Sequence, residues 1–140
     1  MSGVFLDEVY DYVSALPGIA GDWTVAKGIL LDDDPTAGGT DQHVALYEYG
    51  GQPPVLKFGA AAVHYEYPRL QVVCRGKPTD YAGPRAAAQL IYDGLTGVQT
   101  LTLGSTYYLM VRPLQAPFFL NRDDRRRVLI VANYAVERRP

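Results

Sequence analysis

The stretch from Tyr65 to Arg85, YEYPRLQVVCRGKPTDYAGPR, limits the possible folds more than any other part of the sequence. Leu70, Val72 and Cys74 alternate with other residues, which is the period of a β-strand. The segment RGKP that follows contains a glycine and a proline and is typical of a turn. Beyond it the apolar residues recur at helical spacing. The stretch therefore predicts a strand, a tight turn and a helix in immediate succession.

The helix of this unit is expected to run from Asp80 to Leu95. Asp80 or Gly83 can cap its beginning, and Pro84 is tolerated only within the first turn. Pro68 is expected at the first position of the preceding strand, because proline has no N–H for a ladder hydrogen bond. The apolar spacing predicts that the helix packs on the sheet through Ala87, Leu90, Ile91 and Leu95.

A first helix is predicted over residues 4–16, where apolar residues recur three and four positions apart. Asp7, Glu8 and Asp11 are expected on its solvent side, and Pro17-Gly18 should end it. The expected apolar side consists of Val4, Phe5, Val9, Tyr12, Val13 and Leu16.

Further segments are rich in β-branched and aromatic residues and are predicted to be strands. The GGQPP turn suggests that the segments on either side of it, His43–Gly50 and Val55–Gly59, form a hairpin. The last contains Leu129-Ile130-Val131 and should lie centrally, covered on both faces. The predicted strands are Val25–Leu31, His43–Gly50, Val55–Gly59, Val98–Leu103, Thr106–Pro113 and Arg127–Arg138.

The order of these elements predicts an α+β fold in one domain over residues 1–140. Its expected form is a mainly antiparallel, mixed sheet with two helices packed on one face. The segment Asn121–Arg127 (NRDDRRR) should be a polar hairpin tip that leads into the last strand, and Pro113 and Pro117 should interrupt the chain before it. A chain of 140 residues can bury a proper core without covalent staples.

Composition excludes several classes of protein. The single cysteine, Cys74, allows no internal disulfide and no cysteine-based zinc site. The first residues have no basic region typical of a signal peptide, and no apolar run approaches the roughly 20 residues that span a membrane. We therefore expect no membrane association.

Charge is unevenly divided along the chain. Residues 1–70 contain ten acidic and three basic residues, for a net −7, and residues 71–140 contain five acidic and ten basic residues, for a net +5. Such a division fits contact between unlike surfaces of neighbouring copies, although solvated loops would give the same totals. Eleven tyrosines also suit a protein interface or ordinary strands.

Motifs of catalysis and metal binding are missing from the sequence. His43 and His64 each stand alone, and Cys74 is expected to be a small buried apolar residue. The aspartates in the loop Asp32–Asp41 do not form an EF-hand, because its sixth position is Ala37 and its twelfth is His43. We expect no metal, no cofactor and no enzymatic activity.

Three segments together resemble the minor capsid and tail terminator proteins of long-tailed bacteriophages. They are YEYPRLQVVCRG, DYAGPRAAAQLIYDGL and RPLQAPFFLNRDDRRRVLIVANYAVER, which extend from Tyr65 to about Arg138 in the order of the family. The resemblance implies a structural virion protein with a sheet and helices on one side, assembled in the host cytoplasm. It implies a ring, commonly a homohexamer, that ends growth of the tail tube and joins the tail to the neck.

The resemblance further implies contacts with the tail-tube protein and a neck or head-completion protein, with DNA passing through the ring without sequence-specific binding. Within this picture, one group of residues is expected at a subunit or partner interface: Arg125, Arg126, Arg127, Phe118 and Phe119. A second group is expected on the wall of the lumen: Asp32, Asp33, Asp34 and Asp41.

Three alternatives remain open on the sequence alone. A tail-completion or head-closure protein of the adjacent neck layer would have similar size and style. A small ligand-binding domain would need an apolar pocket with convergent polar groups. An enzyme such as a nuclease would need clustered acids and histidines at strand ends. A protein that reads DNA sequence is not expected, because it would need a basic surface, whereas Asp123 and Asp124 adjoin the arginine run.

Overall fold

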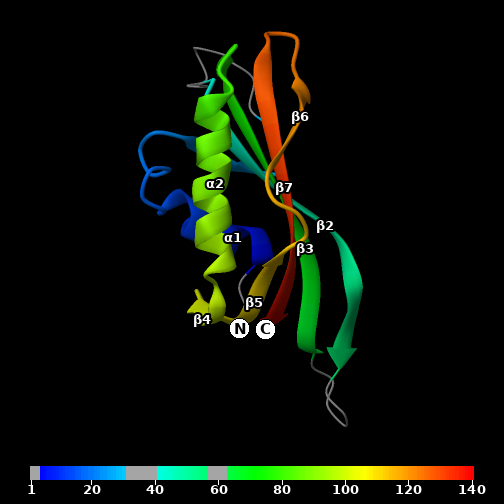
Figure 1. The fold of residues 1–140 in the computed structure, drawn as a ribbon. Coiled ribbons are helices and arrows are strands. Elements are labelled where there is room, and N and C mark those ends of the chain that lie inside the picture. Colours follow the sequence, from blue (N-terminus) through cyan, green and yellow to red (C-terminus); the bar gives the residue numbers. More distant parts are fainter. Residues whose placement is uncertain (1–3, 31–40, 57–62) are drawn as a thin grey trace.

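The fold is an α+β arrangement in which two helices lie on the same face of a curled sheet (Figure 1). This computed structural model describes residues 4–30, 41–56 and 63–140. The helices are α1 (Phe5–Ser14) and α2 (Ala82–Thr96). The strands are β1 (Thr24–Lys27), β2 (His43–Leu56), β3 (Val63–Pro78), β4 (Gln99–Leu103), β5 (Thr106–Pro113), β6 (Phe118–Arg122) and β7 (Arg127–Arg139).

The strands form one sheet in the order β1-β2-β3-β7-β5-β4, and β6 pairs with β7 beside this path. The β1–β2 pair is parallel, and each of the other pairs among the described strands is antiparallel. β7 is central: its first half pairs with β6, and its second half pairs with β5. The predicted mixed, mainly antiparallel sheet is confirmed.

The main core lies between the helices and the sheet. Leu70, Val72 and Cys74 of β3 point into it and are almost completely buried, as their alternation predicted. β7 adds every second residue from Val128 to Val136. On the opposite face, Val131 is buried with Ala45 and Val73 in a smaller cluster.

Helix α2 packs on the sheet through three of the four predicted residues, Ala87, Ile91 and Leu95. Leu90 was expected in the core but is 43% exposed, so that prediction was wrong. Ala88, which is 3% exposed, is buried in its place. Leu90 instead lies over Gly18, where a Cβ would come within 2.7 Å of its Cδ1. The buried residues of α2 are Pro84, Ala87, Ala88, Ile91 and Leu95.

Helix α1 also differs from expectation at two positions. Val4 precedes the helix and is 65% exposed, so it does not belong to the apolar side. Glu8 was expected in solvent but is 6% exposed. It is buried because a tyrosine hydroxyl and an arginine from the sheet meet its carboxylate. Apolar periodicity cannot reveal such a partner.

The predicted hairpin at the GGQPP turn is wrong. β2 continues through this segment and pairs with β3, so the two strands form a long arm below the helices (Figure 1). The register shifts between Tyr49 and Gln52, opposite Pro68, which therefore lies inside β3 and not at its start. This break in the ladder accommodates a residue without an N–H. Part of the predicted strand Val55–Gly59 lies outside the described residues.

Candidate assembly surfaces

The hairpin between β6 and β7 is organised by Asp123. Its Oδ1 accepts hydrogen bonds of 2.9 Å from the backbone N–H groups of Arg125 and Arg127. Its Oδ2 accepts a 2.7 Å hydrogen bond from Nε of Arg127. Burial acts to raise the pKa of Asp123, but the hydrogen bonds from Arg127 and Arg125 outweigh it and lower this pKa. Asp123 is therefore ionised at physiological pH and can accept these hydrogen bonds.

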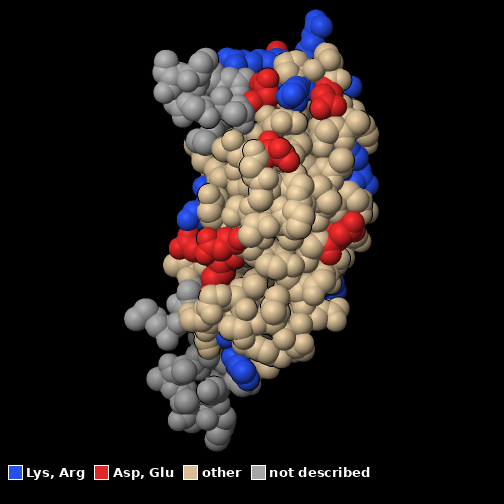
Figure 2. Space-filling view, turned by 90° about the vertical axis from the view of Figure 1, so that its left-hand side faces the viewer, with Lys and Arg blue, Asp and Glu red and all other residues tan. Residues whose placement is uncertain are grey.

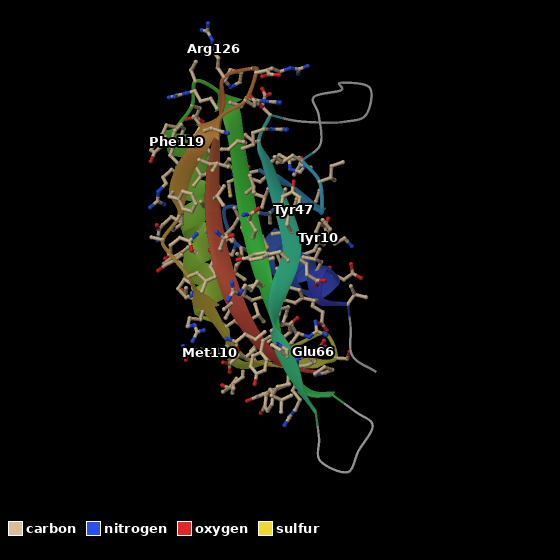
Figure 3. All side chains as sticks on the ribbon, turned by 90° about the vertical axis from the view of Figure 1, so that its right-hand side faces the viewer. Tyr10, Tyr47, Glu66, Met110, Phe119 and Arg126 are labelled. Carbon is tan, nitrogen blue, oxygen red and sulfur yellow. The ribbon has the colours of Figure 1, made fainter. Side chains whose placement is uncertain are left out.

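The three arginines of this tip have different environments. Arg127 is 5% exposed and also lies 3.3 Å from the carboxylate of Asp41, so its guanidinium makes its contacts within the subunit. Arg125 and Arg126 are exposed. Figure 3 shows Arg126 projecting beyond the end of the sheet, and Figure 2 shows basic side chains gathered at that end of the molecule. Two of the three predicted interface arginines therefore present their charge outward.

Strand β6 exposes an unusual amount of apolar surface. Phe118, Phe119 and Leu120 are 38%, 42% and 52% exposed. The ring of Phe119 lies 6.4 Å from that of Tyr81, and the guanidinium of Arg122 lies 5.4 Å from it. In Figure 3, Phe119 lies at a margin of the sheet. Adjacent exposed aromatic and aliphatic side chains of this kind typically mark protein interfaces.

The aspartates predicted on the lumen wall fall into two groups. Asp32, Asp33 and Asp34 lie outside the described residues. Asp41 is partly buried, and its carboxylate holds Arg127 while its carbonyl oxygen accepts a 3.1 Å hydrogen bond from Nε of Arg75. Asp41 thus connects the start of β2 with the tip of the β6–β7 hairpin.

A buried ionic group joins α1 to the lower end of the sheet, and the sequence did not suggest it. Arg138 is 4% exposed and lies 3.5 Å from the carboxylates of Glu8 and Glu66. Its guanidinium also faces the rings of Phe5 and Tyr108 at 5.7 and 5.8 Å. One signal could have revealed it: Arg138 continues the alternation of inward residues Tyr134 and Val136.

The candidate reactive groups are placed as structural residues. Cys74 is fully buried, and burial raises the pKa of its thiol to about 12, which keeps it protonated. Burial, followed by the charge of Arg75, lowers the pKa of His43 to about 4. Within the described ranges, no three His, Cys, Asp or Glu residues are grouped as metal ligands would be. The described helices include none long and apolar enough to cross a membrane.

A comparison with protein families identifies the chain. The model of the family described as bacteriophage tail terminator protein matches residues 21–139. The chain belongs to the bacteriophage tail terminator family. The match contains every strand and helix α2, and it supports the resemblance seen in the sequence. No curated protein matches the chain. As a tail terminator family member, the protein is a structural component of the phage virion that associates with other tail or neck proteins.

Proposed function

We propose that the protein forms a ring, a homohexamer, at the end of the phage tail tube. There it stops addition of the tail-tube protein and presents a surface to the neck or head-completion protein, and DNA passes through its centre. The observation that carries this proposal is the family match over residues 21–139. The proposed role is structural, with no catalytic step.

Two features of the molecule support association between copies. Contact with a partner would remove the exposed apolar side chains of β6 from water. The basic hairpin tip and the acidic first half of the chain provide unlike charges that would meet in a head-to-tail contact. We place Arg125, Arg126, Phe118 and Phe119 at this contact and Asp32, Asp33 and Asp34 on the wall of the lumen, where acidic groups would repel DNA phosphates.

Sedimentation velocity and negative-stain electron microscopy of the purified protein test the ring. We expect closed rings that dissociate as salt is raised, because exposed ion pairs are screened within about 8–10 Å at physiological ionic strength. The variant Arg125→Glu/Arg126→Glu should assemble more weakly than wild type. Asp93→Lys, on the exposed side of α2, is the matched control and should assemble normally. Monomers under every condition, both in solution and on the particle, would contradict the proposal.

A further inference from the structure

The strands β1 and β6 lie at opposite sides of the sheet, and the same rows of paired residues run from one to the other. Val25 of β1 pairs with Val44, Val44 with Cys74, Cys74 with Ile130, and Ile130 with Phe119 of β6. The next row runs in the same way from Ala26 to Phe118. β1 and β6 therefore end the same five-stranded part of the sheet on opposite sides and at the same height.

Both strands have an outer edge that pairs with no other strand in the described part of the chain. The N–H groups of Thr24 and Gly28 donate to β2, so those of the intervening Val25 and Lys27 point away from it. β1 has four residues and β6 has five. Neither contains proline, and each carries its only charge at its last residue, Lys27 or Arg122. The short length and the terminal charge limit pairing of each edge, but neither edge is blocked by a proline.

The directions of the strands also suit each other. Antiparallel pairing from β2 through β3 and β7 to β6, together with the parallel β1–β2 pair, makes β6 run opposite to β1. Copies related by rotation about an axis roughly along the strands keep these directions. The β6 of one copy would then meet the β1 of the next in an antiparallel pair, which is the more common arrangement.

Antiparallel alignment brings complementary charges together at one end of the contact. The beginning of β1 meets the end of β6, so Asp22, two residues before β1, lies near Arg122, and both are exposed. In the register given by the shared rows, Phe119 comes opposite Val25 and Phe118 opposite Ala26. The opposite charges of Asp22 and Arg122 favour this register of the pair.

We propose that the outer edge of β6 in one copy pairs with the outer edge of β1 in the next, so that the sheet continues from subunit to subunit. This inference rests on the proposed ring and specifies how its copies join. The contact is heterologous, as a closed ring requires. It also covers the exposed aromatic side chains of β6.

A disulfide scan tests the contact. The double variant Asp22→Cys/Arg122→Cys should form a ladder of covalent oligomers under oxidising conditions, both in the purified protein and in particles that carry it. Each single variant should give at most dimers, and Asp22→Cys/Asp93→Cys is the matched control without a ladder. Cys74 should not contribute because it is buried.

Charge exchange provides a second measurement. Asp22→Arg and Arg122→Asp should each weaken self-association by about 2- to 30-fold, since loss of an exposed ion pair and its replacement by a like-charge pair each cost about 0.2–1 kcal/mol. The double exchange should restore it. If the wild-type protein forms rings but the variants show neither the ladder nor this rescue, the β1–β6 contact is wrong and the proposed ring still stands. Absence of any oligomer in solution and in particles would overturn the ring and this contact together.

Discussion

The hydroxyl of Tyr108 donates a 2.7 Å hydrogen bond to Oε1 of Glu8 and so connects β5 with α1 across 100 positions of sequence. Burial, and then the hydrogen bond to Glu8, raise the pKa of Tyr108, so the phenol keeps its proton and remains a donor. Tyr108→Phe should lower the free energy of unfolding by about 1–3 kcal/mol, because a buried carboxylate loses its donor. Denaturant melts measure this. Tyr107→Phe is the control, and an equal loss there would contradict the interpretation.

The two neighbouring apolar residues of α2 should respond differently to truncation. Ile91 is completely buried, and Ile91→Ala should cost about 2–5 kcal/mol of unfolding free energy. Leu90→Ala should cost well below that, because Leu90 retains much of its exposure in the folded chain. Thermal or urea unfolding of the two variants checks the orientation of the helix. A larger loss for Leu90→Ala would show that the helix is rotated from the position described.

Arg127 should matter for folding, whereas Arg125 and Arg126 should matter for assembly. Arg127→Met removes the guanidinium bound by Asp123 and Asp41, and we expect a loss of about 1.5–3 kcal/mol in stability. Arg125→Met/Arg126→Met should change stability by less than about 0.5 kcal/mol. Reversing all three charges would therefore confuse two effects. Equal stability of both variants in urea melts would refute this division.

His43 should make stability depend on pH in a defined range. Its pKa is about 4 in the folded chain and 6.5 ordinarily, so between these values the unfolded chain binds a proton that the folded chain does not. Stability should rise with pH across this window, by up to about 1.4 kcal/mol per pH unit, and be fully present above pH 6.5. His43→Gln should flatten the curve of unfolding free energy against pH. An unchanged slope in that variant would assign the effect to other groups.

The sequence predicted those parts of the fold that depend on local periodicity. The turn into α2, the inward side of β3 and the bounds of β5 follow from alternation and from turn residues. Pairing between strands that lie far apart in the sequence could not be predicted in this way. Two glycines and two prolines suggested a turn at Gly50–Pro54, but β2 continues through them with shifts in its register with β3.

The candidate surfaces show the same distinction. Phe118, Phe119 and the arginine run could be chosen from composition, because exposed aromatic and basic residues are typical of interfaces. The burial of Arg127 was harder to predict, because one of its two carboxylate partners, Asp41, lies 86 positions away. The shared row of β1 and β6 likewise becomes visible only when four strand registers are combined.

Tail length in a phage that lacks this gene tests the central claim most directly. Electron microscopy of lysates would give the distribution of tail lengths and the fraction of heads joined to tails. Loss of a terminator should leave filled heads apart from tails, or tails of uncontrolled length, and the wild-type gene supplied in trans should restore both. Unjoined tails of normal length would indicate the neck layer instead. Normal, joined virions without this protein would contradict the account.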